Sequence, residues 1–222
     1  MKIALLDAHN QDYEKIWKIS KEFKDQYCKI MNYDCLSFEF EKLPNNFFPT
    51  WGRIFALQQH LPNYDWILYL DTDVIITNYS VELSQFLNTS KNIILSRMPN
   101  REGAETHLST SAMLIRNCEW TFNFLDKWLL QTHFNTNPYF ASKENILKAT
   151  MDYGGLFYEQ SAMHYLFDTD EDAFNNIEVM PNCWFNTRDY NKNTKDFLVH
   201  FASQNDKYGR MKSFLKRKKL FL

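Results

Sequence analysis

The sequence predicts an α/β fold in which a mixed, mostly parallel β-sheet is flanked by helices. Through the first half of the chain, short apolar runs typical of buried strands alternate with amphipathic segments typical of helices. This alternation is characteristic of a parallel sheet covered on both faces. The 222 residues are 45% hydrophobic and 17% aromatic, which favours a globular domain with a sizeable core. We find no internal repeat, low-complexity segment or linker, and therefore expect a single domain over residues 1–222.

The N-terminal part begins with an expected strand, helix and second strand. Residues 2–7 form an apolar run, and residues 11–32 carry apolar side chains at helical spacing. Apolar and polar side chains alternate in residues 36–40, which indicates a strand. After two prolines, Thr50 is placed to cap a helix that runs through Leu57.

The next apolar run, residues 65–70, ends at Asp71 and Asp73, and a second apolar run follows at residues 74–76. Carboxylates between buried strands cost several kcal/mol unless a positive group binds them. Open α/β sheets bind ligands at the carboxyl ends of their strands. Two carboxylates at i and i+2 therefore suit a hard divalent cation that also carries phosphate oxygens. The alternative is a strand-end turn with solvated aspartates.

The second half continues with shorter elements. Residues 132–145 are polar and irregular, which predicts a loop or lid over the site. The expected helices are residues 81–87, 120–130 and 157–167, and the expected strands are residues 93–95, 112–115, 179, 184–185 and 197–199.

Composition excludes several kinds of site. With five glycines and neither a Gly-x-Gly-x-x-Gly fingerprint nor a Walker-type loop, the chain must hold a nucleotide by other means. The four cysteines, Cys28, Cys35, Cys118 and Cys183, form no Cys-x-x-Cys pair, which favours buried free thiols over a zinc site. No apolar run reaches the roughly 18 residues of a membrane span. The N-terminal run is too short for a signal peptide, so a cytoplasmic location is expected.

Charge is distributed unevenly along the chain. The formal net charge is −2, yet residues 207–222 carry seven basic side chains and no acidic one. An acidic domain with a basic, apolar tail is not typical of a nucleic-acid-binding protein, so no nucleic-acid partner is expected. The tail fits two alternatives, which are peripheral contact with an anionic membrane surface and a solvated terminal helix.

Two further segments offer polar side chains to a site. His200 ends an apolar strand, where a lone histidine is most often a hydrogen-bonded core residue. Beside two aspartates, it would complete a mixed oxygen and nitrogen site of the type that suits manganese. Glu159 and Gln160 begin a helix, where they either complement the helix dipole or place a polar side chain against a reacting carbon.

Other candidate residues are weak singly. Arg53 is either a cation that faces the site or a surface charge, and Lys207, seven residues after His200, is within reach of a diphosphate. The small residues Thr110 and Ser111 permit close approach of a sugar to the backbone, although such residues are also common in loops.

In combination, these residues resemble glycosyltransferases of the GT-A fold, which carry an Asp-x-Asp motif at a strand end. More narrowly, the chain is similar to family 34, the fungal and plant α-galactosyl-, α-mannosyl- and α-xylosyltransferases. The similarity runs in family order from about residue 27 to residue 202. The matching blocks are Tyr27-Cys28 with Tyr33, Trp51-Gly52-Arg53, Trp66 through Asn78, Leu114-Ile115-Arg116-Asn117 with Trp120, Phe124, Leu125 and Trp128, Glu159-Gln160-Ser161-Ala162, Phe185-Asn186, and His200-Phe201-Ala202.

The resemblance implies a Rossmann-like GT-A fold and a role for each matching residue. Asp71, Asp73 and His200 would hold Mn²⁺ or Mg²⁺ together with the diphosphate of a nucleotide sugar, with UDP-sugars favoured. Gln160 would lie beside the anomeric carbon, with Glu159 as the alternative, and Asp71 would also act in catalysis. The residues expected to contact the nucleotide sugar are Asp7, Ala8, Arg53, Asp71, Thr72, Thr110, Ser111 and Lys207.

This sequence departs from the family pattern at several places. The family usually has lysine where Arg53 stands, glycine where Ser111 stands, and Gly-Cys where Ala202-Ser203 follows the His-Phe block. The family's usual N-terminal membrane anchor is not seen in the sequence. These departures bear on the donor sugar and on the diphosphate contacts.

The expected reaction moves a hexose or pentose to a saccharide, glycolipid or glycoprotein acceptor with retention of configuration. The two protein carboxylates that flank the sugar in retaining hydrolases cannot be identified in the sequence, so a front-face path is the default hypothesis. The alternatives are an inactive or carbohydrate-binding protein, with Trp51, Trp120 and Trp184 stacking on sugars, and a haloacid dehalogenase-type phosphatase. The phosphatase motif normally opens the first strand and continues Gly-Thr, whereas Val74-Ile75 follows here.

Overall fold

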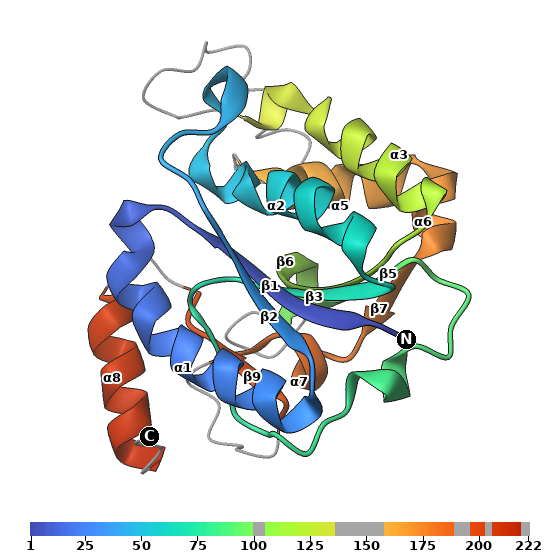
Figure 1. Cartoon of the computed structure of the whole chain (residues 1–222). Coiled ribbons are helices and arrows are strands. Elements are labelled where there is room, and N and C mark those ends of the chain that lie inside the picture. Colours follow the sequence, from blue (N-terminus) through green and yellow to red (C-terminus); the bar gives the residue numbers. More distant parts are fainter. Residues whose placement is uncertain (100–104, 136–157, 189–195, 203–205, 219–222) are drawn as a thin grey trace.

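A computed structural model describes residues 1–99, 105–135, 158–188, 196–202 and 206–218 (Figure 1). Its centre is a six-stranded sheet with the order β2-β1-β3-β6-β5-β7. β6 runs antiparallel to both of its neighbours, whereas the other adjacent strands pair in parallel, so the expected mixed, mostly parallel sheet is confirmed. The strands are β1 (Ile3–His9), β2 (Asp34–Glu39), β3 (Trp66–Leu70), β5 (Ile93–Pro99), β6 (Glu105–Arg116) and β7 (Ile177–Met180).

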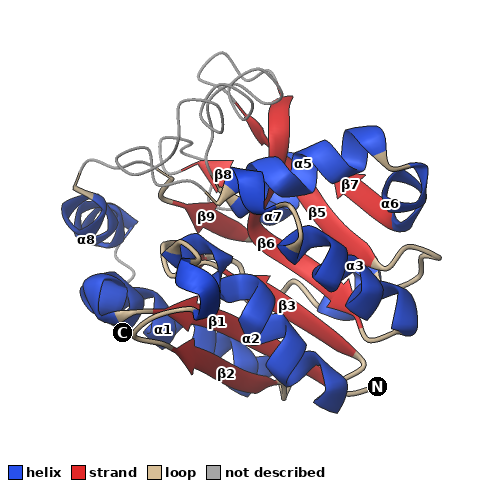
Figure 2. Ribbon diagram, turned by 90° about the horizontal axis from the view of Figure 1, so that it is seen from above, coloured by secondary structure: helices blue, strands red, loops and turns tan. Residues whose placement is uncertain are grey.

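Helices cover both faces of this sheet (Figure 1, Figure 2). α2, α3 and α5 lie on one face, and α1 and α7 pack on the other, with α8 alongside α1. The helices are α1 (Glu14–Met31), α2 (Gly52–His60), α3 (Glu119–Leu129), α5 (Glu159–Thr169), α6 (Glu171–Asn176), α7 (Asn182–Phe185) and α8 (Lys207–Lys218).

The apolar pattern of β3 explains why the sheet is buried on both faces. Successive side chains of a strand point to opposite faces. Ile67 and Tyr69 pack in the core cluster under α2, α3 and α5, whereas Leu68 and Leu70 pack in the cluster under α1 and α7. A strand that is apolar at every position must be covered on both faces. The carboxyl end of β3, where the acidic motif follows, is therefore enclosed as well.

A small second sheet brings the C-terminal part of the chain to the end of β3. β4 (Val74–Ile76) pairs antiparallel with β9 (Leu198–His200), and β9 pairs in parallel with β8 (Thr187–Arg188). Ile75 and Val199 pack with Phe23 of α1 and with Met211 and Phe214 of α8 in a third core cluster. The chain that follows the acidic motif is thus fixed against the C-terminal helix.

Several expectations about single elements are wrong in detail. Trp184 and Phe185 lie in α7 rather than in a strand, because Pro181 ends β7 and Phe185 is buried against the rings of Phe86 and Phe197. Thr50 does not cap α2. The chain already turns in a 3-10 helix over Pro49–Trp51, and the Thr50 Oγ1 atom has no hydrogen-bond partner among the described residues.

Other differences concern length and exposure. β6 extends to Glu105, well before the expected start at residue 112, so the small polar residues lie within the strand. All four cysteines are free, but only Cys28 is buried and Cys35 is exposed. Trp51 is fully buried, so its ring is not available to stack on a sugar. Most of the expected loop at 132–145 lies outside the described residues, apart from a 3-10 turn at Thr132–Phe134.

Residues 207–218 of the basic tail form α8, which packs against the domain rather than extending from it. Phe214 is 2% exposed and its ring contacts Phe201, while Lys212, Lys216 and Arg217 are exposed. The apolar side of the helix is therefore used within the fold. Among the described residues, none of the helices is both long and apolar enough to span a membrane.

Candidate active site

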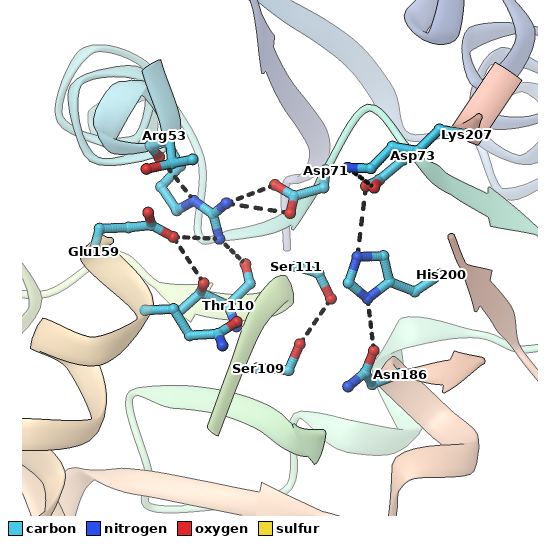
Figure 3. Close-up of polar contacts among 12 residues, drawn as sticks. Arg53, Asp71, Asp73, Ser109, Thr110, Ser111, Glu159, Asn186, His200 and Lys207 are labelled. Atoms are coloured by element: carbon cyan, nitrogen blue, oxygen red, sulfur yellow. Dashed lines mark hydrogen bonds and ion pairs between the residues drawn. The ribbon is translucent and has the colours of Figure 1, made fainter. Parts of the chain in front are cut away.

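The acidic motif occupies a tight turn between β3 and β4 (Figure 3). The amide of Val74 donates to the Asp71 carbonyl at 3.2 Å and closes the turn. The Asp71 amide donates to the Ser111 carbonyl on β6 at 2.8 Å, and the Phe201 amide donates to the Asp73 carbonyl at 3.0 Å. These bonds fix the two carboxylates between the two sheets, where Asp73 is buried and the Asp71 side chain is 21% exposed.

β9 brings His200 to this turn. In the antiparallel pairing of β4 with β9, His200 lies opposite Val74, and its Nε2 atom is 3.5 Å from Asp73 Oδ1. One ligand atom from each of Asp71, Asp73 and His200 lies within 4.8 Å of the others. Ligands around an octahedral ion with bonds of about 2.1 Å are separated by about 3 to 4 Å. A small adjustment of these side chains therefore accommodates a divalent cation.

Asn186 determines which nitrogen of His200 faces the carboxylates. Its amide nitrogen donates to the Arg97 carbonyl at 3.2 Å, which turns its oxygen toward His200 Nδ1 at 2.8 Å. Because this oxygen can only accept, Nδ1 carries the hydrogen. Nε2 then faces Asp73 Oδ1 at 3.5 Å, where it pairs with the carboxylate when protonated and is free to bind a metal ion when neutral. The donor set thus fits a bound cation.

Two largely buried cations neutralise the acidic motif (Figure 3). One guanidinium nitrogen of Arg53, on α2, lies 2.9 and 3.2 Å from the two carboxylate oxygens of Asp71. Lys207, the first residue of α8, places its Nζ atom 2.7 Å from Asp73 Oδ2. Burial would lower the pKa of each cation, but the facing carboxylates outweigh it and raise both pKa values. Both side chains are therefore charged at neutral pH.

The two aspartates differ in pKa. Burial raises the pKa of Asp71 to about 6, with Arg53 opposing the shift and the charge of Asp73 adding to it. Burial acts on Asp73 in the same direction, but His200 and Lys207 outweigh it and hold its pKa at about 2. Asp73 is therefore ionised throughout the physiological range, whereas Asp71 takes up a proton as the pH falls through about 6.

The start of α5 supplies a third acidic group. Glu159 Oε1 lies 3.1 Å from a guanidinium nitrogen of Arg53 and accepts a hydrogen bond from Thr110 Oγ1 at 3.0 Å. Glu159 Oε2 is buried and has no hydrogen-bond partner among the described residues. The neighbouring Gln160 is partly exposed, and its side-chain oxygen lies 3.5 Å from the Thr110 amide. Glu159 is thus fixed in place with one carboxylate oxygen unpaired.

Asp7 lies at the carboxyl end of β1 and is 2% exposed. Its carboxylate accepts hydrogen bonds from Trp17 Nε1 at 3.1 Å, from Ser37 Oγ and from Lys24 Nζ at 3.0 Å. Lys24 Nζ also donates to the Asp71 carbonyl at 3.0 Å. Asp7 and Lys24 therefore connect β1, β2 and α1 to the acidic turn.

The structure brings nearly all of the expected site residues into one hydrogen-bonded network. Ser111 contacts it through its carbonyl, and its Oγ atom lies 2.8 Å from Ser109 Oγ. Thr72 is buried within the acidic turn itself. Ala8 follows Asp7 on β1, and its side chain packs against the core.

Two residues of the network were not expected to contribute. Lys24 lies on the buried stripe of α1 with Ser20, Phe23 and Tyr27. A lysine at an apolar helical position is a signal for a buried partner. Asn186 belongs to one of the segments that resemble family 34. Its role depends on the contact with His200, and the residues next to Asn186 in the sequence do not reveal that contact.

A model of the galactosyl transferase GMA12/MNN10 family matches residues 3–102 and 90–207 of the chain. Galactomannan galactosyltransferase 1 of Cyamopsis tetragonoloba is 25% identical over 111 residues, which are 48% of this chain and 26% of that protein. The probable xyloglucan 6-xylosyltransferase 3 of Arabidopsis thaliana is 24% identical over 113 residues, which are 47% of this chain and 24% of that protein. The chain thus matches about a quarter of the length of these relatives.

Solved structures share the fold at lower sequence identity. A glycosyltransferase involved in glycosylation of the major capsid of PBCV-1 is 17% identical, with a TM-score of 0.70 over 96% of this chain and 99% of that one. The galactosyltransferase LgtC, in complex with donor and acceptor sugar analogues, is 12% identical, with a TM-score of 0.57 over 98% and 96% of the two chains. These structures confirm the expected GT-A fold. With the family match, they favour glycosyl transfer over the phosphatase alternative.

Proposed function

Since this chain belongs to the galactosyl transferase GMA12/MNN10 family, we propose that it transfers a hexose or pentose from a nucleotide-diphosphate sugar to a saccharide or glycoconjugate acceptor. UDP-sugars are the proposed donors, and Mn²⁺ or Mg²⁺ is the proposed cofactor. One observation supports the metal most directly, which is that Asp71, Asp73 and His200 each offer a ligand atom within 4.8 Å of the other two.

Asp71, Asp73 and His200 would hold the metal, and the donor diphosphate would complete its coordination. A bound divalent cation neutralises the charge that develops on the leaving phosphate without the need for a proton. Asn186 would keep the His200 lone pair directed at the ion, because its amide oxygen holds the hydrogen on Nδ1. Lys207, whose Nζ atom lies 2.7 Å from Asp73 Oδ2, would bind a diphosphate oxygen of the donor.

The sugar would lie over β6 and the start of α5. The unpaired Oε2 of Glu159 is an acceptor for a sugar hydroxyl, and Gln160 is the partly exposed side chain next to it. Glu159 is 1% exposed and paired with Arg53 through Oε1, which suits binding better than nucleophilic attack. We therefore propose a retaining, front-face path in which the leaving phosphate accepts the acceptor's proton and Gln160 stabilises the reacting centre.

A screen of nucleotide sugars tests the function. The protein is titrated with UDP- and GDP-sugars in Mn²⁺ and in EDTA by isothermal calorimetry, and the products of the bound sugars are identified by mass spectrometry. We expect metal-dependent binding of a UDP-sugar and release of UDP. Asp65→Asn is a matched control, since Asp65 is an exposed aspartate that contacts the N-terminal residues. Absence of metal-dependent binding for every nucleotide sugar would exclude the proposal.

Peripheral contact with an anionic membrane is a separate proposal for the outer face of α8. Lys212, Lys216 and Arg217 are exposed on this helix. Each basic residue near an anionic leaflet contributes about 1 kcal/mol of binding. Sedimentation with anionic vesicles should fall when the three residues are changed to glutamate, whereas equal, negligible binding of both proteins would leave a soluble acceptor as the better proposal.

A further inference from the structure

Two of the four cysteines face each other across the junction of α1 and β2. Cys28 lies in the last turn of α1. Asn32 follows the helix with a φ of 56° and reverses the chain, so that β2 runs back along the helix. Cys28 Sγ is 3.8 Å from the carbonyl oxygen of Asp34, the residue immediately before Cys35, so the Cys28 thiol lies next to the start of Cys35.

The pleat of β2 gives independent support for this pairing. Side chains two residues apart on a strand share a face, so Cys35 and Ser37 point to the same side. Ser37 Oγ lies 3.1 Å from Trp17 Nε1 of α1, whereas Leu36 and Phe38 pack in the core cluster on the opposite face. Cys35 is therefore directed at α1, where Cys28 lies.

The exposure of the two thiols differs in a way that suits stepwise oxidation. Cys35 is exposed, whereas Cys28 is 3% exposed. A reagent in solution therefore reaches Cys35 first and Cys28 only through it. Cys118 contacts the Thr121 hydroxyl at 3.3 Å, and Cys183 lies on α7, on a different part of the chain.

We propose that Cys28 and Cys35 are a redox-active dithiol that closes to an intrachain disulfide between α1 and β2. With a low-molecular-weight disulfide as oxidant, the Cys35 thiolate attacks one sulfur, forms a mixed disulfide and releases one thiol. The Cys28 thiolate then attacks the Cys35 sulfur and releases the second thiol. The protein loses two electrons and two protons, and the oxidant is reduced to two thiols.

The neighbouring Cys28 thiol raises the pKa of the Cys35 thiol. The thiolate is the attacking species, so closure should become faster as the pH rises. The crosslink would join two elements that hold the same carboxylate. Lys24, one turn before Cys28, and Ser37, two residues after Cys35, both bind Asp7. A disulfide here would therefore restrain the support of the acidic turn.

The test equilibrates the full chain with oxidised and reduced glutathione, blocks free thiols with N-ethylmaleimide and maps the peptides by mass spectrometry. We expect two thiols to become protected as a linked Cys28–Cys35 pair under oxidising conditions and to be released by dithiothreitol. The oxidised protein should unfold at a temperature higher by about 5 °C, as expected for a short crosslinked loop in a domain of this size. Cys35→Ser should abolish both effects, whereas a Cys118→Ser/Cys183→Ser protein should retain them.

A parent protein that alkylates at both Cys28 and Cys35 after full oxidation would overturn the proposal. So would a stable glutathione adduct on Cys35 that Cys28 fails to resolve. Both of these outcomes are measured on the unsubstituted protein, so the test does not depend on whether a variant folds.

Discussion

Lys207 is the residue whose replacement tests the electrostatics of the site most sharply. In the structure its Nζ atom lies 2.7 Å from Asp73 Oδ2, and its side chain is 22% exposed. A metal ion that binds Asp73 competes with Lys207 for this carboxylate. The competition is relieved when Lys207 binds a diphosphate instead. Lys207→Met keeps the aliphatic stem and removes the charge, so Mn²⁺ alone should bind more tightly, whereas UDP in the presence of Mn²⁺ should bind more weakly.

The magnitude follows from the contact that is lost. A hydrogen bond to a charged group contributes about 1.5 to 3 kcal/mol, and each 1.4 kcal/mol is about a tenfold change in affinity. Affinity for Mn²⁺ alone should therefore rise by about ten- to a hundredfold. The assay follows free Mn²⁺ by electron paramagnetic resonance and UDP binding by calorimetry. Lys212→Met, an exposed change on the same helix, is the control.

Two results would refute this reasoning. If Lys207→Met binds Mn²⁺ alone no more tightly than the parent, the lysine does not compete for Asp73. If UDP affinity in Mn²⁺ is unchanged, the lysine does not move to the diphosphate.

Three further predictions concern pH, catalysis and support. Burial raises the pKa of Asp71 to about 6, so protonation removes a metal ligand below that pH. The affinity for UDP in the presence of Mn²⁺ should therefore fall about tenfold per pH unit below 6. A calorimetric affinity that stays constant from pH 7 to 5 would contradict this prediction. Gln160→Ala should lower the turnover rate about a hundredfold while donor affinity stays within a few-fold, and a steady-state rate equal to the parent's would remove Gln160 from the mechanism. Lys24→Met leaves the buried Asp7 carboxylate without its ion pair and should lower the free energy of unfolding by about 3 to 5 kcal/mol. Urea denaturation measures this loss, with Lys29→Met as the control. An equal loss of stability in both variants would mean that the ion pair is unimportant.

The position of the acidic motif could be predicted because it depends on local pattern. The apolar run before Asp71 fixes a buried strand, and the end of such a strand lies at a ligand-binding edge. The convergence of His200 on Asp73 could not be read from spacing, since more than a hundred residues separate them, and it was expected through the resemblance to a family.

Failures of the sequence reasoning have physical causes. The strand was expected to begin at residue 112, because small polar residues such as Thr110 and Ser111 are also common in loops, yet Ser109, Thr110 and Ser111 lie within β6. Their hydroxyls and carbonyls are bonded to site residues, so these polar side chains are satisfied at a buried position. Trp184 and Phe185 read as a strand because a four-residue helix leaves no periodicity to detect. The role of Lys24 cannot be predicted from its neighbours in sequence, because its partners, Asp7 and the Asp71 carbonyl, lie on or next to other strands.

The central claim is that Asp71, Asp73 and His200 hold one divalent cation together with a nucleotide diphosphate. The most direct measurement is calorimetric titration of UDP into the parent protein and into Asp73→Ala, each in Mn²⁺ and in EDTA. We expect the parent to bind UDP tightly only in Mn²⁺, and we expect Asp73→Ala to show no such metal dependence while remaining folded by circular dichroism. Metal-dependent binding of UDP by Asp73→Ala at the parent's affinity would contradict it.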